Sequence, residues 1–322
     1  MKKILILHTG GTIAMSEDVQ TGEVKPNSNN PLHDTIMKME NVSISVEDFL
    51  NVPSPHMTIV NMLSLAKRID ERVINEAFDG VVITHGTDTL EETAYLLDLT
   101  VISSVPVVVT GAMRSSNELG SDGPYNLLSS VRTAMSDQAH DKGVLVVLND
   151  EIHTAKNVTK THTSNIATFQ SPQYGPIGIV TKRHVQFHQS PTKQETFPVE
   201  KMSKKVLLVK AVAGMEKEVF DAICNIHMDG LVIEALGQGN VPPELVSAIE
   251  KLVQNNIPVV LVSRCFNGIV QDVYGYKGGG KHLKDIGVIF TNGLSGQKAR
   301  IKLMVALESS SETKSLHSSF DL

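Results

Sequence analysis

Short apolar runs without polar alternation recur along the chain and mark its predicted strands. This pattern is typical of strands in a parallel sheet, which are buried on both faces. In the first half of the chain the predicted strands are Ile4–Leu7, Val81–Thr84, Pro106–Thr110 and Val144–Leu148. Apolar residues at helical spacing lie between them, as from Met62 to Val73. This alternation predicts an α/β fold with a doubly wound, mostly parallel sheet.

The alternation resumes after a polar interruption, which predicts a second domain. Residues 189–204 are polar and contain prolines, so we expect a linker between an N-terminal domain, 1–188, and a smaller C-terminal α/β domain, 205–322. A chain of 322 residues also exceeds the roughly 250–300 residues at which one core usually divides. The tail from about residue 309 contains few apolar residues, so it is expected to fray.

Composition and charge favour a small-molecule partner over nucleic acid or a membrane. The formal net charge is −6, and no block of like charges offers the basic surface that nucleic-acid binding needs. No apolar run approaches the ~18 residues of a membrane span, and the first run is too short for a secretory signal. Cys224 and Cys265 are too few for a disulfide framework. We therefore expect a cytoplasmic protein.

Two turns that end in threonine follow predicted strands. HTGGT ends at Thr12, and HGTDT covers His85–Thr89. In an open α/β sheet ligands bind outside the carboxyl ends of the strands, so both turns are expected to face one crevice. Gly10 and Gly11 let backbone N–H groups approach a ligand, which leaves Thr12 near a helix N-terminus.

A threonine hydroxyl becomes a nucleophile only beside a base that a third group holds, and Asp88 with Lys160 can supply that relay. These residues also have a structural interpretation. Thr89 with Glu92 matches a capping box, and Asp88 is a candidate N-cap. Lys160 lies in a polar stretch and can be a solvated surface lysine. Capping, however, does not require threonines at two separate strand ends.

The two turns and several later segments resemble the bacterial L-asparaginases. The matching segments are HTGGTIA (8–14), HGTDTLEETA (85–94), VTGAMR (109–114), SDGPYNL (121–127), GVLVVLND (143–150), VTKTHTSNIATF (158–169) and LSGQKARIKL (294–303). The resemblance implies an amidohydrolase of the cytoplasmic type that converts L-asparagine to L-aspartate and ammonia, with glutamine as a minor substrate. It also implies a homotetramer, built as a dimer of dimers with sites between subunits, and neither a metal nor another cofactor.

The resemblance assigns roles to individual positions. Thr12 corresponds to the nucleophile that forms a β-acyl-enzyme, and Thr87, Asp88 and Lys160 correspond to the group that activates the attacking species. Asp88 also corresponds to the residue that receives the substrate ammonium. The other substrate-binding positions implied are Ser54 for the α-carboxylate, Gly11 and Thr87 around the reacting amide, and Asn240 from a neighbouring subunit.

Two positions depart from the family pattern. Family members usually carry a tyrosine in the loop after the first motif, whereas the first tyrosine here is Tyr95. Pro55 stands where many secreted members have a glutamine beside the serine. We hypothesise that Tyr274 or Tyr276, in a glycine-rich loop, replaces the absent tyrosine from a neighbouring subunit. The alternative is that both rings only pack that loop.

Other functions stay open at this point. One is the related subunit that deamidates glutamine for transfer RNA charging, and another is an amino-acid sensor that has lost turnover. GYKGGGKH differs from a phosphate-binding loop because His282 replaces the required hydroxyl. His184 and His188 have zinc-ligand spacing, but their segment alternates like a strand. His8 and His85, at strand ends, are expected to be hydrogen-bonded structural residues.

Overall fold

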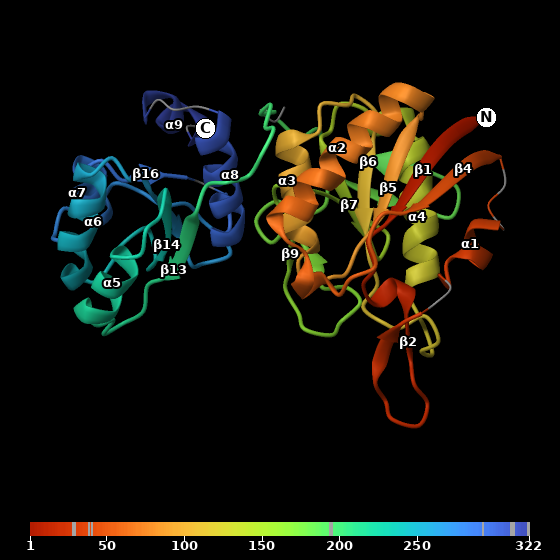
Figure 1. Cartoon of the computed structure of the whole chain (residues 1–322), viewed down its shortest axis with the longest axis horizontal. Helices are drawn as coiled ribbons and strands as arrows, with labels where there is room; N and C mark the ends of the chain where they lie inside the picture. The colour runs from red at the N-terminus through yellow and green to blue at the C-terminus, as the bar shows by residue number, and fades with distance from the viewer. Residues whose placement is uncertain are drawn as a thin grey trace. The chain divides into compact units, whose positions relative to one another are not determined.

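The computed structural model describes residues 1–27, 30–37, 39, 41–192, 196–291, 293–309 and 313–320. The chain forms two compact units, Met1–Thr196 and Phe197–Leu322 (Figure 1). Their boundary falls within 189–204, the segment expected to be a linker, of which residues 193–195 lie outside the described residues. Each unit combines parallel strands with helices, which confirms the predicted α/β class.

The first unit contains a mostly parallel sheet (Figure 1). Its strands, in spatial order, are β12 (Val185–Phe187), β11 (Gly178–Val180), β8 (Glu151–Thr154), β7 (Val144–Leu148), β6 (Val107–Thr110), β5 (Gly80–Thr84), β1 (Lys2–His8) and β4 (Val42–Asp48). β4, β1, β5, β6 and β7 are parallel, whereas β8, β11 and β12 add antiparallel pairs. The chain moves from β1 outward to β4 and then crosses back to β5, so the topological switch point lies between β1 and β5.

Helices cover both faces of this sheet because alternate side chains of each strand point to opposite sides. Leu5 and Leu7 of β1 pack with α2 (Ile59–Glu76) and α3 (Leu90–Thr100). Ile4 and Ile6 pack with α4 (Gly123–Met135). All four side chains are fully buried, which explains why the predicted strand is apolar without alternation.

Shorter elements connect the strands and helices of the first unit. They are the 3₁₀ turns η1 (Thr12–Ala14), η2 (Ser54–His56) and η3 (Asp137–Ala139), helix α1 (His33–Met37), and strands β2 (Met15–Glu17), β3 (Val24–Pro26), β9 (Thr159–Lys160) and β10 (Phe169–Gln170). β2 and β3 form an antiparallel hairpin that extends away from the sheet directly after the first threonine turn (Figure 1). β9 pairs with β10 in the same antiparallel way.

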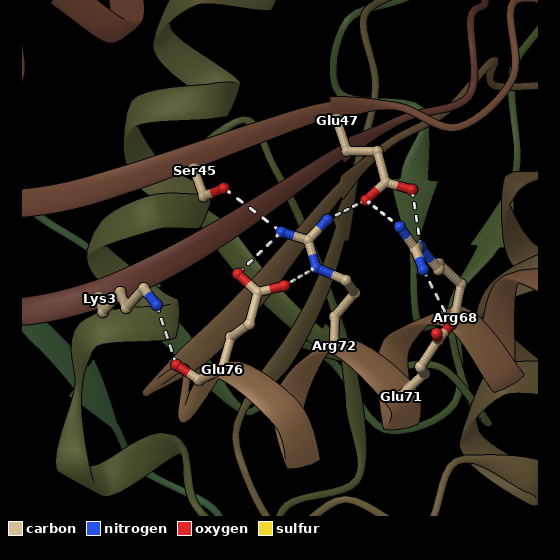
Figure 2. A network of polar contacts seen from close by, with 7 residues as sticks. All are labelled: Lys3, Ser45, Glu47, Arg68, Glu71, Arg72 and Glu76. Atoms are coloured by element: carbon tan, nitrogen blue, oxygen red, sulfur yellow. Dashed lines mark hydrogen bonds and ion pairs between the residues drawn. The ribbon is translucent and has the colours of Figure 1, made fainter.

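A network of ion pairs fastens the edge strand β4 to α2 (Figure 2). Glu47 accepts hydrogen bonds from Arg68 Nε at 2.8 Å and Nη2 at 3.1 Å, and it also binds Arg72. Arg72 in turn binds Glu76, whose main-chain oxygen accepts from Lys3 Nζ at 2.9 Å. The hydrogen bond to Glu47 raises the pKa of Arg68 above its usual value. The network thereby ties one edge of the sheet, including β1, to the helix that covers it.

The second unit contains a smaller, parallel sheet in the order β13 (Val206–Lys210), β14 (Gly230–Ala235), β15 (Val259–Ser263) and β16 (Ile289–Phe290). Its helical elements are α5 (Lys217–Cys224), η4 (Pro243–Leu245), α6 (Val246–Gln254), α7 (Gly280–Asp285), α8 (Gly296–Ser309) and α9 (Thr313–Phe320). None of the helices described in either unit is long and apolar enough to cross a bilayer.

Helix α9 differs from the frayed tail that the sequence predicts. Leu316 and Phe320 are only 4% and 3% exposed, and the Lys302 ammonium lies 5.2 Å from the centre of the Phe320 ring. Two apolar residues four positions apart share one helix face, which is enough to anchor a short helix in a polar segment. Residues 310–312 and 321–322 of the tail lie outside the described part.

Candidate active site

The two threonine turns leave the sheet side by side at its switch point. β1 and β5 are neighbouring parallel strands, and His8 pairs with Thr84 at their carboxyl ends. Thr9 donates to the Thr84 carbonyl from its main-chain N at 3.0 Å and from its hydroxyl at 2.9 Å. Both turns therefore begin at the edge where open α/β sheets bind ligands, as the sequence predicts.

Close backbone contacts join the two turns to the segment that carries Ser54. Gly11 has a φ of 84°, and a Cβ atom there would overlap with main-chain atoms of Gly86. A Cβ atom at Gly86 would lie 2.7 Å from the Cβ of Ser54, which is closer than real side chains approach. Glycine is therefore required at both positions. Thr12 follows Gly11 and Thr87 follows Gly86, so the close contact between the two glycines also brings the two threonine residues near each other.

Thr12 is the first residue of η1 and lies partly exposed at the end of the first turn. The next two residues, Ile13 and Ala14, are buried, and the Ala14 N–H donates to the Gly11 carbonyl at 2.9 Å. The turn is thus anchored on both sides of Thr12. This arrangement holds the residue in place and still leaves its side chain within reach of a small molecule.

Lys160 reaches the second turn with its side chain. Its Nζ donates to Thr87 Oγ1 at 3.0 Å and to Asp88 Oδ1 at 2.7 Å. The Lys160 side chain is 16% exposed, so the alternative of a solvated surface lysine is wrong, whereas the Asp88 side chain is 59% exposed. Because Lys160 Nζ donates to Thr87 Oγ1, the hydroxyl proton of Thr87 can point toward a ligand.

Ser54 links η2 to the second turn through both its side chain and its main chain. The Asp88 N–H donates to Ser54 Oγ at 3.1 Å, and Thr89 Oγ1 donates to the Ser54 carbonyl at 2.8 Å. Thr89 is the N-cap residue of α3, but its side chain caps no N–H group among the described residues. Thr89 therefore stands at the predicted N-cap position, although its hydroxyl is used across the site, and the prediction that Asp88 is the N-cap is wrong.

Glu91 is a residue of this group that the sequence did not identify. It lies in the first turn of α3, is 5% exposed, and accepts from Thr159 Oγ1 at 3.0 Å and from the Lys160 N–H at 3.2 Å. Glu91 lies within the matching segment HGTDTLEETA, but the sequence assigns it no role of its own. Its position three residues after Asp88 was the available signal, because a carboxylate there shares the helix end that carries Thr87 and Asp88.

Two buried histidines lie at the carboxyl ends of β1 and β5, where the turns begin. His8 Nδ1 lies 2.7 Å from Thr84 Oγ1, and His85 contacts the Gly86 carbonyl through Nδ1 at 2.8 Å and Thr93 Oγ1 through Nε2 at 2.9 Å. Burial lowers the pKa of each ring to about 4, so both are neutral at pH 7. Neutral, hydrogen-bonded rings fit the structural role that the sequence predicts for them.

Three candidate residues belong to the second unit. Asn240 Oδ1 accepts from the Gly280 N–H at 3.3 Å, which ties it to the glycine-rich loop. The rings of Tyr274 and Tyr276 pack on each other with centroids 5.6 Å apart, and the residues are 41% and 56% exposed. The tyrosines therefore pack within their loop and at the same time keep surface that another molecule can reach.

The described residues contain no group of three or more histidine, cysteine, aspartate and glutamate side chains arranged to hold a metal ion. His184 and His188 flank the short strand β12, in agreement with the strand-like alternation of their segment. The candidate site thus consists of hydroxyls, one lysine, carboxylates and backbone N–H groups of the first unit.

Comparison with known proteins finds similarity along both units. Residues 3–193 match the family described as "Asparaginase, N-terminal", and residues 205–320 match "Glutaminase/Asparaginase C-terminal domain". A probable L-asparaginase from Deinococcus radiodurans is 38% identical over 311 residues, which are 95% of this chain and 93% of that protein. An L-asparaginase from Bacillus licheniformis is 34% identical over 313 residues, 97% of each chain. The crystal structure of a probable cytoplasmic L-asparaginase from Campylobacter jejuni superposes with a TM-score of 0.85 at 34% identity, covering 99% of both chains.

Proposed function

The chain belongs to the asparaginase family, and from this premise we propose that it hydrolyses the side-chain amide of L-asparagine to L-aspartate and ammonia. The observation that carries this proposal is a set of contacts made by Lys160. Lys160 Nζ contacts both Thr87 Oγ1 and Asp88 Oδ1 at the switch point, beside the contact of Gly11 with Gly86. A hydroxyl that accepts from a lysine, which a carboxylate holds in turn, can serve as a proton relay, and amide hydrolysis needs one.

Substrate binding follows from the charges of asparagine. The exposed carboxylate of Asp88 receives the substrate ammonium, because it keeps one side toward solvent while the other holds Lys160. Ser54 Oγ accepts the Asp88 N–H and keeps its own proton, which it donates to the substrate carboxylate. The backbone at Gly11 and Thr87 surrounds the reacting amide, where N–H groups stabilise the oxyanion of the tetrahedral intermediate.

Thr12 is the nucleophile in this proposal. Its Oγ forms a bond to the amide carbon, the C–N bond breaks, and the Thr12 hydroxyl proton passes to the leaving nitrogen, so that ammonia leaves and a β-acyl-enzyme remains. A water molecule then attacks the ester carbon, which releases L-aspartate and returns a proton to Thr12 Oγ. Thr87 and Lys160 move the protons that these steps require, and what supports this role is the 3.0 Å hydrogen bond between them.

The assembly and compartment are part of the same proposal. We expect a homotetramer, a dimer of dimers, in which Asn240 and one of Tyr274 and Tyr276 come from the neighbouring subunit. We also expect a cytoplasmic enzyme that uses no metal and no other cofactor. The exposed rings of the two tyrosines support a role in contacts between subunits.

Ammonia release by purified protein tests the proposed function. We expect turnover of L-asparagine by the wild type, and a loss of about three orders of magnitude or more in kcat for Thr12→Ala. Thr12→Ser, which keeps a hydroxyl at the same position, is the matched control and should retain much more activity. A Thr12→Ala protein within tenfold of the wild type would overturn the assignment of the nucleophile.

The same assay separates the two alternatives. The glutamine-deamidating subunit predicts faster ammonia release from glutamine than from asparagine. A sensor predicts that asparagine raises the thermal midpoint of the protein by binding while no ammonia forms.

A further inference from the structure

Lys160 occupies a short strand that brings its side chain to the second turn. β9 contains only Thr159 and Lys160 and pairs with a strand of equal length, where Lys160 lies opposite Phe169. The pairing continues after Lys160, where the Thr161 N–H donates to the Thr168 carbonyl at 2.8 Å, but the Lys160 N–H itself points to Glu91. The relay requires that the Lys160 ammonium stay within hydrogen-bond distance of Thr87 Oγ1.

Glu91 supplies a second attachment from the opposite side. Its Oε1 accepts from the Lys160 N–H at 3.2 Å and from Thr159 Oγ1 at 3.0 Å, so one oxygen fixes both residues of the strand. Glu91 is only 5% exposed, so water competes little for its carboxylate. Glu91 stands in the first turn of α3, the helix that begins just after Thr87 and Asp88.

The N-terminal end of α3 therefore binds Lys160 both at its main-chain N–H and at its side-chain ammonium. Thr87 and Asp88 hold the ammonium, and Glu91 holds the main-chain nitrogen. We propose, on the basis of the proposed function, that Glu91 is a positioning residue that sets where the Lys160 ammonium meets Thr87. Glu91 does not touch the substrate in this proposal and acts only through Lys160.

Glu91 can also have a purely stabilising role, because any acid in the first turn of a helix interacts favourably with the helix dipole. The two roles make different demands on the side chain. Glu91→Asp keeps the charge at the helix start but shortens the side chain by one methylene, so it preserves the dipole interaction and loses the reach to β9. Glu91→Gln keeps the length and an acceptor oxygen but removes the charge.

Kinetics of these variants test the proposal. Glu91→Ala and Glu91→Asp should lower kcat for asparagine by about 10- to 100-fold, because a displacement of about 1 Å at a catalytic group costs rate on that scale. KM should change less than about threefold, since Asp88 and Ser54 keep their contacts. Glu91→Gln should recover kcat to within about fivefold of the wild type. In a Lys160→Met background, Glu91→Ala should have no further effect.

Asp98 provides the matched control for general destabilisation. It is also a buried acid of α3, 6% exposed, and its Oδ1 accepts the Val144 N–H of β7 at 2.7 Å. Asp98→Ala should lower the thermal midpoint and leave kcat within about twofold. If Asp98→Ala and Glu91→Ala lower kcat equally, the loss reflects stability and the proposal is wrong.

A readout that does not depend on turnover separates this proposal from the proposed function. Acetylation of Lys160 by acetic anhydride, followed by mass spectrometry, should be several times faster in Glu91→Ala and Glu91→Asp than in the wild type and Glu91→Gln. If the wild type releases no ammonia, the proposed function fails, and the labelling rates alone decide the positioning role. Equal Lys160 labelling rates in Glu91→Ala, Glu91→Asp and the wild type would overturn it.

Discussion

His8 and His85 make the first unit sensitive to acid, although neither is a candidate catalyst. Burial lowers both pKa values from 6.5 to about 4, so between these limits an unfolded chain binds protons that the native state does not. The contribution of these two histidines to stability is fully present above pH 6.5 and is lost as the pH falls toward 4. Each histidine should remove about 2 kcal/mol of unfolding free energy between pH 7 and pH 5.

His85→Gln tests this, because glutamine offers a donor and an acceptor but does not titrate in this range. The variant should be less stable at pH 7, and its thermal midpoint should fall less than that of the wild type between pH 7 and pH 5. His56→Gln, at a solvent-exposed position, is the control for the histidine-to-glutamine exchange itself. Parallel curves for the wild type and His85→Gln would contradict the argument.

The contact between β4 and α2 concentrates charge at one edge of the sheet. Glu47 and Arg72 are 20% and 15% exposed, so removal of the Glu47 charge leaves a mostly buried guanidinium without its strand partner (Figure 2). Glu47→Gln should therefore lower the unfolding free energy by about 1–3 kcal/mol, measured as the urea midpoint. Glu71→Gln, which removes an exposed partner of Arg68, should cost only a few tenths of a kcal/mol. Equal effects would show that burial does not strengthen this network.

The sheet of the first unit contains strands that the sequence can predict and an edge strand, β4, that it cannot. Central strands such as β5 are recognised because both of their faces are buried and the run is apolar throughout. β4 was not predicted, because Val42, Ile44 and Val46 alternate with residues that face α2 and solvent. Edge strands of this kind carry charge for the partner helix, so their pattern depends on tertiary contacts that a local reading does not contain.

The candidate site also contains residues that the sequence can predict and residues that it cannot. Thr12, Thr87 and Asp88 could be proposed from the chain alone because a turn directly after a parallel strand must lie at the ligand-binding edge. The contacts of Lys160 depend on a two-residue strand 72 residues after Asp88, which no local pattern marks. Glu91 cannot be identified from the chain alone, since its bonds to β9 exist only in the folded structure.

At the scale of the whole molecule, the site proposed for the first unit is expected to be completed by the neighbouring subunit. The rings of Tyr274 and Tyr276 pack together, and a phenylalanine at either position keeps that packing while it removes the hydroxyl. If one of these hydroxyls serves the neighbour's Thr12, the corresponding phenylalanine variant should lose most of its kcat and keep its thermal midpoint. Tyr125→Phe, at a position 42% exposed in the first unit, is the matched control and should keep full activity.

Mixed oligomers then decide whether the hydroxyl acts across subunits. Thr12→Ala protein is mixed with the inactive tyrosine variant, dissociated and reassembled. Random pairing gives mixed pairs in half of the dimers, and one of the two sites in each combines an intact Thr12 with an intact tyrosine, so about a quarter of wild-type activity should return. A mixture of Thr12→Ala with Lys160→Met should recover nothing, because both residues come from the first unit of one chain and no interface can restore the pair. Full activity of both tyrosine variants before any mixing would eliminate this role, and inactivity that persists after mixing would place the phenol within its own subunit.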